Sequence, residues 1–212
     1  MKRLTLAFAI ALLCALPAAA RETVRTFSKQ LPTGGIQLVD LDFSVGEVAV
    51  EAWDGGALQI DVQLQCKHDR GSCREAAQRV KLVYSTEADK LHIEMKGWPK
   101  ISGHSLEARI EIKMPRSLAL DADLGVGEMR LAGLTNNVRA NLGVGELTLT
   151  LPESAVGSVR ADTGVGEANL TAGGHHYESA GLFSKELHWD KGTGTAKIWA
   201  DCGVGEINVR LQ

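Results

Sequence analysis

The sequence predicts an all-β protein, a β-solenoid of stacked Gly-Val-Gly-Glu rungs with antiparallel strands in its N-terminal half. Two observations lead to this fold class. The tetrad recurs along the chain, and apolar residues alternate with polar ones on both sides of every copy. Repeats of roughly 20 residues are typical of β-solenoid coils, whose rungs must stack because none buries its apolar face alone.

The N-terminal segment has the pattern of a secretory signal peptide. Two basic residues precede an apolar run, Leu4–Leu16, and the small residues Ala18–Ala20 follow it. The run is too short for a membrane-spanning helix. We therefore expect residues 1–20 to be removed on export. Residues 21–212 are expected to form one domain in the periplasm, outside the cell or at the cell surface.

The charge balance argues against nucleic acid as a partner. The 212-residue chain has a formal net charge of −3, which becomes −5 when Lys2 and Arg3 are removed. A mildly acidic domain lacks the basic surface that binds phosphate backbones. Beyond the signal segment, no stretch approaches the roughly 18 apolar residues of a membrane span. We expect no nucleic-acid partner and no transmembrane segment after signal cleavage.

In the N-terminal half, short alternating segments separated by turn residues predict antiparallel strands that are solvated on one face. These segments are residues 58–64, 80–84, 91–95 and 106–114. A single helix is predicted over residues 73–79, because Ser72 and Glu75 have the spacing of a capping box.

The repeat dominates the rest of the chain. The five copies are Ser44–Glu47, in which Ser replaces the first Gly, Gly125–Glu128, Gly143–Glu146, Gly164–Glu167 and Gly203–Glu206. The last four Glu residues are 18, 21 and 39 positions apart. The final interval is close to two rungs, so we expect a degenerate rung within residues 172–195.

Alternation within each copy predicts which side chains point inward. Counting back from the Glu, positions two, four, six and eight should face the core, and counting forward, positions one and three. The Val of every tetrad, at position two, is thus expected to be buried. The inward-facing positions are even-numbered before the Glu and odd-numbered after it, so the alternation is interrupted at the Gly-Glu pair. The chain should therefore turn a corner there, which glycine permits.

Three cysteines remain after the signal segment. Cys66 and Cys73 flank a polar segment, and export to an oxidising compartment favours a disulfide between them. A zinc site would need more ligands than the nearby His68 supplies. Cys202 stands at an inward position of its repeat, so we expect a buried free thiol.

The order of these motifs resembles a known family. A hydrophobic-x-hydrophobic-Pro segment, Ile112–Pro115, closes the early strands, and repeated Gly-containing strands such as Gly127–Leu131 follow it. In this respect the chain resembles the bacterial putative-adhesin domains of unknown function, whose shape is called a toast rack. The resemblance covers nearly the whole mature chain. It implies an envelope protein without catalytic residues of its own.

The Glu residues form the most regular candidate site, either a binding face or a structural ladder: Glu47, Glu128, Glu146, Glu167 and Glu206. In register, Glu128, Glu146 and Glu167 would lie one above another at about 4.8 Å. Like charges at that spacing repel by about 0.9 kcal/mol per pair in water. Backbone N–H groups or Arg130, Arg139 and Arg160 could offset this repulsion. The alternatives are Ca²⁺, for which one Glu per rung is a poor cage, or a cationic partner.

A second polar row lies five positions before each Glu, at Asp42, Asp123, Asn141, Asp162 and Asp201, and should face outward. The same acids recur in every rung, which is typical of structural residues, whereas a glycoside hydrolase needs one carboxyl pair. His175, His176 and His188 lack a complete ligand set, so no metal site is expected. Trp199 falls on an outward row and is the best candidate for stacking on a sugar.

We therefore expect a non-enzymatic, adhesin-like structural or binding scaffold of the cell envelope, without cofactor. Its partner would be an envelope protein or a glycan. The alternatives are a carbohydrate-active β-helix enzyme and an accessory subunit of an envelope stress-sensing system.

Overall fold

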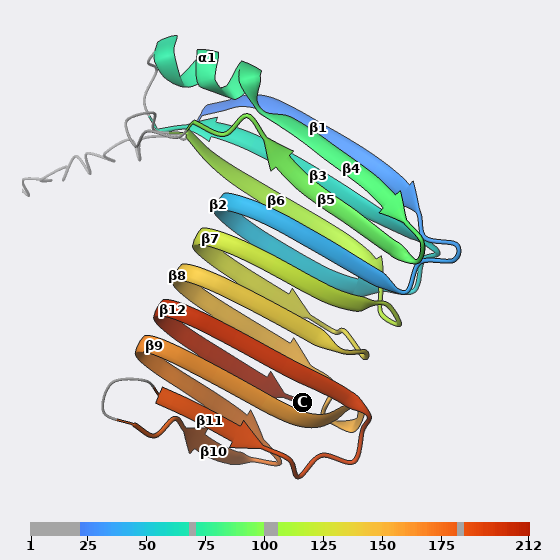
Figure 1. Cartoon of the computed structure of the whole chain (residues 1–212), viewed down its shortest axis with the longest axis vertical. Helices are drawn as coiled ribbons and strands as arrows, with labels where there is room; N and C mark the ends of the chain where they lie inside the picture. Colours follow the sequence, from blue (N-terminus) through green and yellow to red (C-terminus); the bar gives the residue numbers. More distant parts are fainter. Residues whose placement is uncertain (1–21, 68–70, 100–105, 182–184) are drawn as a thin grey trace, which may run out of the picture.

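The computed structural model describes residues 22–67, 71–99, 106–181 and 185–212 (Figure 1). The predicted signal peptide, residues 1–20, lies outside them. The described chain consists almost entirely of β-strands, with one α-helix and one short 3-10 helix. The prediction of an all-β protein is confirmed. No described helix has the length and apolar character needed to cross a membrane.

The elements follow one another along the chain with these bounds. They are β1 (Glu22–Pro32), β2 (Leu38–Trp53), β3 (Ala57–Cys66), α1 (Gly71–Arg79), β4 (Lys81–Glu87), β5 (Lys90–Lys96), β6 (Leu106–Pro115), β7 (Ala119–Ala132), β8 (Val138–Leu151), η1 (Glu153–Ala155), β9 (Val156–Ala172), β10 (His175–Glu178), β11 (Lys185–Trp189) and β12 (Ala196–Leu211). The four strands predicted in the N-terminal half appear as β3 to β6. β1, which was not predicted, pairs with β3. The helix already begins at Gly71, so Ser72 lies inside its first turn.

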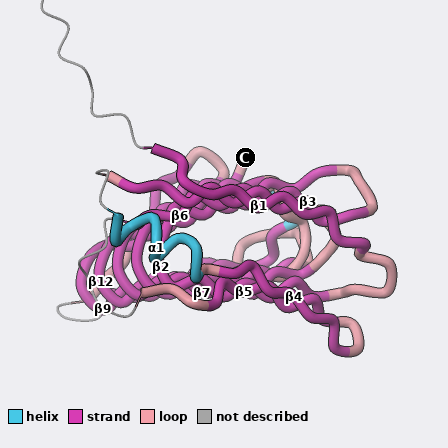
Figure 2. Tube along the Cα trace, turned by 90° about the horizontal axis from the view of Figure 1, so that it is seen from above, coloured by secondary structure: helices cyan, strands magenta, loops and turns pink. Residues whose placement is uncertain are grey.

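The strands form two layers that are joined along one edge. The five repeat strands, β2, β7, β8, β9 and β12, bend at their tetrads, so each contributes one half to each layer (Figures 1 and 2). In the first layer, the halves before the tetrad are flanked by β5 and β11. In the second layer, the halves after the tetrad are flanked by β6 and β10. All of these strands belong to one open sheet of twelve strands.

The five tetrads lie in register in parallel strands. Gly127 pairs with Gly46, and the same position continues through Gly145 and Gly205 to Gly166. The spatial order is β2, β7, β8, β12, β9. The expectation that Glu146 and Glu167 are neighbours is therefore wrong, because β12 lies between β8 and β9. β10 and β11 occupy the other side of β9, so that side is not open to β12.

The interval before β12, where a degenerate rung was expected, contains two short strands that pair antiparallel with β9. β11 pairs with the first half of β9, from Lys185 opposite Thr163 to Trp189 opposite Val159. β10 pairs with the second half of β9. These two short strands cover the edges that β9 would otherwise expose at this end of both layers, where long open edges invite pairing with other chains.

The core lies between the two layers, and most inward positions are as predicted. Positions eight, six and four before the Glu, and one and three after it, are buried in all five copies. Cys202 is buried and free, beside Leu142 and Thr163 in its cross-strand row. The Val of the tetrad is the exception. Val126, for example, is 48% exposed, so the prediction that these valines face the core is wrong.

The Cys66–Cys73 disulfide is present and joins β3 to α1, with 6.2 Å between the two Cα atoms. The helix is also held at its C-terminal end. The Arg25 guanidinium donates hydrogen bonds to the carbonyl oxygens of Ala77, Gln78 and Val80, at 2.8–3.0 Å. Cations at this end satisfy the free carbonyls and oppose the helix dipole.

Candidate binding face at the strand corner

The second Gly of each tetrad makes the corner. Its φ lies between 140° and 152° in all five copies, a region that side chains rarely adopt. The strands also approach one another closely here. A Cβ added to Gly145 would lie 1.8 Å from the carbonyl oxygen of Gly127 in the neighbouring strand. Both the backbone conformation and the stacking therefore require glycine.

The first Gly of the tetrad is required by stacking alone. A Cβ on Gly143 would lie 2.4 Å from the carbonyl oxygen of Gly125, although the φ of Gly143 is not positive. In β2, Ser44 holds this position. β5 pairs with β2 only as far as Asp42, and β6 pairs with it only from Glu47. Among the described strands none pairs with β2 beside Ser44 on that side, which explains how a side chain fits in this copy.

The Val between the two glycines stands at the outside of the bend, where no layer faces it. Five large hydrophobic side chains are exposed in the described chain: Tyr84 (46%), Val126 (48%), Val144 (46%), Val165 (65%) and Val204 (47%). Four of the five are tetrad valines, and Val45 of β2 continues their line half-buried. We call this row of Val45, Val126, Val144, Val204 and Val165 the Val ridge. An ordered line of exposed apolar side chains is typical of a contact surface.

The Glu row runs beside the Val ridge on the second layer, in the order Glu47, Glu128, Glu146, Glu206, Glu167. Arg130 pairs with Glu128, and Lys185 Nζ lies 3.2 Å from Glu167 Oε1. The two central carboxylates have neutral partners. Thr148 Oγ1 donates to Glu146 Oε1 at 3.4 Å, and Asn208 Nδ2 donates to Glu206 Oε1 at 3.0 Å. Arg139 and Arg160 instead belong to the first layer.

An acidic row runs beside the Val ridge on the first layer. It consists of Glu94, Asp42, Asp123, Asn141, Asp201, Asp162 and Glu186, which pair across seven adjacent strands. The five residues predicted on this row do face outward, and β5 and β11 extend it by one Glu at each end. Sequence reasoning missed these two, because neither strand contains a tetrad.

The ion pairs of the acidic row lie at its two ends. Arg160 pairs with Asp162 and Glu186, at 2.9 Å and 2.8 Å. Lys96 Nζ lies 2.8 Å from Glu94 Oε1. Within the described ranges, Asp42, Asp123 and Asp201 form no ion pair. Asp123 accepts a hydrogen bond from an uncharged side chain instead: Asn141 Nδ2 donates to Asp123 Oδ1 at 2.7 Å.

A hollow lies between the acidic row and the corner, and we call it the corner groove. It has a volume of about 660 Å³ and crosses β2, β7, β8 and β12. The lining residues are Asp42, Phe43, Ser44, Asp123, Leu124, Gly125, Asn141, Leu142, Gly143, Asp201 and Gly203. The first Gly of three tetrads thus contributes to the groove, because it has no side chain to fill it. The Val ridge follows one residue further along each strand.

The next row on the first layer contains two acids with shifted pKa values, Asp40 and Asp121. It runs Asp40, Asp121, Arg139, Trp199, Arg160. Burial raises the pKa of Asp121, and the neighbouring Asp123 and Asp40 raise it further. Asp121 Oδ1 is buried without a hydrogen-bond partner among the described residues.

The pKa values of two neighbouring acids, Asp40 and Asp201, are also shifted. Burial opposes the ionisation of Asp40, but hydrogen bonds from Lys90 and His92 outweigh it and lower the pKa of Asp40. His92 Nδ1 lies 2.9 Å from Asp40 Oδ2. Burial raises the pKa of Asp201, and Asp162 adds to the effect. Carboxylates in and beside the corner groove are thus partly desolvated.

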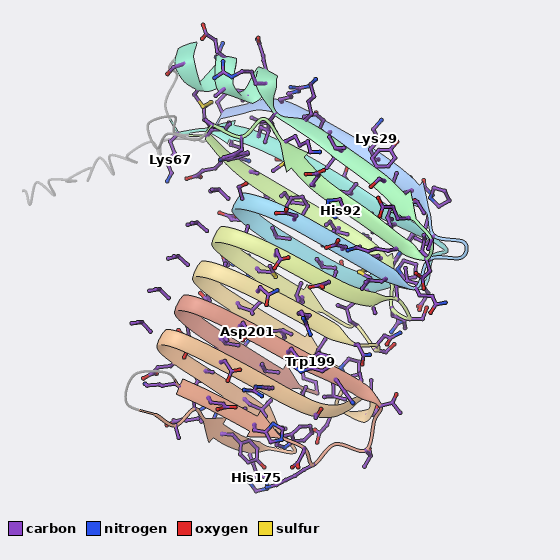
Figure 3. All side chains as sticks on the ribbon, viewed as in Figure 1. Lys29, Lys67, His92, His175, Trp199 and Asp201 are labelled. Atoms are coloured by element: carbon purple, nitrogen blue, oxygen red, sulfur yellow. A yellow bond between two sulfur atoms is a disulfide. The ribbon has the colours of Figure 1, made fainter. Side chains whose placement is uncertain are left out.

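Trp199 lies on this outward row, as predicted, and Figure 3 shows it close to Asp201 on β12. The Arg139 guanidinium stands 5.6 Å from its ring centroid, within the range of a cation–π contact. Trp53 and Trp98 are half-buried, as Trp199 is. Trp189 is buried, and Trp53 Nε1 donates to the carbonyl oxygen of Ala57 at 2.9 Å.

The three histidines that were weighed as metal ligands lie on the end strands, away from the corner groove (His175 in Figure 3). His175 and His176 belong to β10, and His188 belongs to β11. His176 contacts Glu178 at 3.5 Å. Among the described residues, no three or more His, Cys, Asp or Glu side chains are placed to hold a metal ion.

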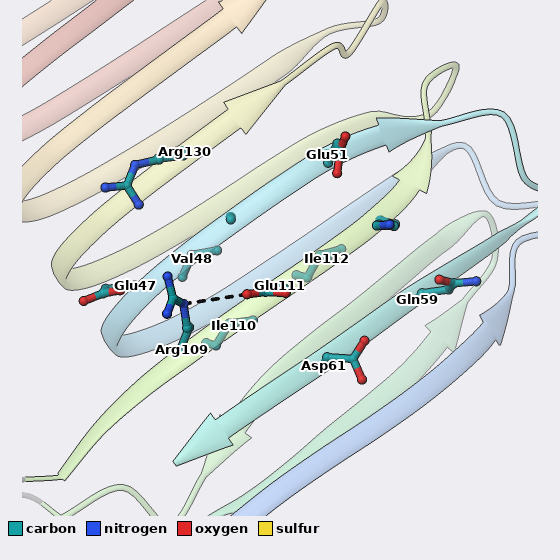
Figure 4. Close-up of a pocket in the computed structure, with 12 residues that line it drawn as sticks. Glu47, Val48, Glu51, Gln59, Asp61, Arg109, Ile110, Glu111, Ile112 and Arg130 are labelled. Atoms are coloured by element: carbon teal, nitrogen blue, oxygen red, sulfur yellow. Dashed lines mark ion pairs between the residues drawn. The ribbon is translucent and has the colours of Figure 1, made fainter. Parts of the chain in front are cut away.

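A second hollow lies on the outer face of the second layer, beside the Glu row (Figure 4). It has a volume of about 310 Å³ and contains side chains of both signs. The charged residues that line it are Glu47, Glu51, Asp61, Arg109, Glu111, Lys113 and Arg130. Arg109 Nε lies 3.6 Å from Glu111 Oε1. Acidic and basic groups neutralise one another here, unlike in the corner groove.

Comparison with known proteins gives a likeness of fold. No protein-family model and no curated protein matches the chain. A crystal structure of a putative cell adhesion protein from Clostridium sporogenes is similar with a TM-score of 0.53 and 16% identity, covering 89% of this chain and 99% of that one. A putative adhesin from Bacteroides fragilis has a TM-score of 0.28 and 12% identity, covering 87% and 97%. The resemblance seen in the sequence is thus confirmed at the level of architecture, and the chain has the fold of a putative cell adhesion protein.

Proposed function

We propose that the protein is an exported, non-enzymatic, adhesin-like scaffold of the cell envelope that binds a partner along the strand corner. In this proposal, residues 1–20 are a signal peptide and residues 21–212 are one mature domain. The repeat strands act as the rungs of a β-solenoid, which places each repeated side chain in a straight row. The Glu row borders the contact surface and also serves as a ladder between strands.

The observation that carries the proposal is the Val ridge. Of the five large hydrophobic side chains exposed in the described part of the chain, four stand in one line, where the glycines on either side leave them prominent. The disulfide is in keeping with an oxidising compartment outside the cytoplasm. The acids of the first layer recur from strand to strand, a pattern that suits a repeated contact surface better than a single catalytic pair.

The test measures how much purified mature protein binds to the envelope fraction of the source bacterium. The variant Val126→Ser/Val144→Ser/Val204→Ser removes the centre of the ridge, and Tyr84→Ser removes an exposed hydrophobic side chain elsewhere. We expect the triple variant to lose most of the binding and Tyr84→Ser to retain it. Both should melt close to wild type, because the substituted side chains are exposed. Unchanged binding of a folded triple variant would show that the ridge is not the contact surface.

A further inference from the structure

We propose that the corner groove binds an extended polypeptide segment in which cationic and apolar side chains alternate. This inference rests on the proposed function, since it names the partner chemistry for the same corner. It concerns the groove between the acidic row and the Val ridge, which crosses four strands.

The charge around the groove selects a cationic partner. Asp42, Asp123 and Asp201 line it, and within the described ranges none of them forms an ion pair. The ion-paired cations stand at the two ends of the acidic row, on Arg160 and Lys96. Burial and Asp162 raise the pKa of Asp201 overall, although Arg139 on β8, which stands beside the middle of the row, lowers that pKa by its charge. An anionic glycan or nucleic acid would be repelled here. A second copy of this chain would also be repelled, because it would bring its own acidic row and Glu row against these carboxylates.

The Val ridge, on the other side of the groove, is best covered by apolar side chains of the partner. Val126, Val144 and Val204 stand one residue beyond the glycines of the groove and are each nearly half exposed. A simple cation would satisfy the acidic row but leave this ridge in water. A partner that covers both must carry charged groups on one side and apolar groups on the other.

An extended polypeptide has this geometry. Successive side chains of a β-strand point to opposite sides, so alternating residues would face the acidic row and the Val ridge respectively. The four strands of the groove span about 14 Å at about 4.8 Å per strand, which about four to five extended residues would fill. In three of the four strands a glycine leaves no side chain along the base to obstruct a backbone, and in β2 the position holds the small Ser44.

The test uses a fluorescently labelled hexapeptide of alternating Lys and Val, with the anisotropy measured against mature protein. Two control peptides replace every Lys with Glu or every Val with Ser. We expect saturable binding of the Lys–Val peptide, weaker binding of the Lys–Ser peptide and none of the Glu–Val peptide. Binding should weaken as salt is raised, because the carboxylates involved are solvent-accessible.

Two double variants locate the site. Asp123→Asn/Asp201→Asn removes two charges from the groove, and Glu51→Gln/Asp61→Asn removes two from the outer face of the second layer. We expect the groove variant to bind the Lys–Val peptide about tenfold more weakly, as the loss of two exposed charge pairs implies. The matched control should bind like wild type. Equal weakening of both variants would overturn the inference, because it would show attraction by net charge alone.

The same variants separate this inference from the proposed function. If the groove variant keeps full binding to the envelope fraction while the ridge variant loses it, the corner is a contact surface whose partner is not cationic, and the inference is wrong. If neither variant changes envelope binding, both proposals are wrong. Binding of the Glu–Val peptide as tightly as the Lys–Val peptide would also overturn the inference.

Discussion

Substituting Gly145 by Ala tests whether the corner depends on glycine as the structure indicates. A Cβ at this position would lie 1.8 Å from the Gly127 carbonyl oxygen, whereas real Cβ contacts are essentially never shorter than 3.0 Å. The two backbones would therefore have to separate by more than 1 Å. The φ of +140° adds strain, because side chains rarely occupy that region.

The cost follows from these two effects. An unfavourable φ costs about 1–3 kcal/mol, and each lost ladder hydrogen bond about 1 kcal/mol. β8 is paired on both sides, with β7 and β12, so separation at Gly145 disturbs two ladders. We expect Gly145→Ala to lower the free energy of unfolding by about 3–5 kcal/mol. For a domain of this size, that lowers the melting temperature by roughly 6–20 °C.

Three further alanine variants separate the effects. Gly143→Ala introduces a close contact without a positive φ, and Gly174→Ala introduces a φ of +75° with no atom within 4 Å. Gly56→Ala introduces neither. Thermal melts followed by circular dichroism should rank Gly145→Ala as the most destabilised and Gly56→Ala as close to wild type. The reasoning is refuted if Gly145→Ala melts within about 2 °C of Gly56→Ala, since roughly 3 kcal/mol cannot produce so small a shift.

Three other outcomes are expected. Glu146→Gln should leave the melting temperature unchanged or slightly raised, because it removes repulsion of about 0.9 kcal/mol per neighbouring Glu in water. A large loss of stability would show instead that the fold requires the carboxylate. Asp121→Asn should raise the melting temperature at pH 7, because burial and acidic neighbours raise the folded-state pKa of Asp121 and its ionised form opposes folding. That gain should shrink as the pH falls and the wild-type carboxyl is protonated, so a gain that grows toward acid pH would contradict the assignment. Alkylation of unreduced, denatured mature protein should label Cys202 alone and label Cys66 and Cys73 only after reduction, as mass spectrometry can show.

Local pattern predicted much of this protein because each feature depends on nearby residues. Alternation identified β3, β4, β5 and β6, and it identified the buried positions on both sides of each tetrad. The tetrad glycines located the corner, since close strands and a positive φ both exclude side chains there. The short interval between Cys66 and Cys73, together with the expected export to an oxidising compartment, predicted their disulfide.

The direction in which the corner points was decided only by the tertiary structure. Alternation counted through the tetrad places Val144 inside. The chain bends at this point, so Val144 stands on the outside of the bend, where no second layer can cover it. A period-two alternation of apolar and polar residues does not show whether the residue at the centre of a bend lies on the inside or the outside of that bend. The exposed ridge was consequently missed, and with it the groove on which the binding proposal rests.

The order of the strands was likewise beyond the reach of the sequence. The tetrads are nearly identical, so any repeat strand can pair in register with any other. Which strands become neighbours depends on which edges are already covered. β10 and β11 fold back on β9, and β12 takes the remaining position between β8 and β9. The sequence by itself determined the rows of side chains, while tertiary contacts decided the order of the strands and which row faces the solvent.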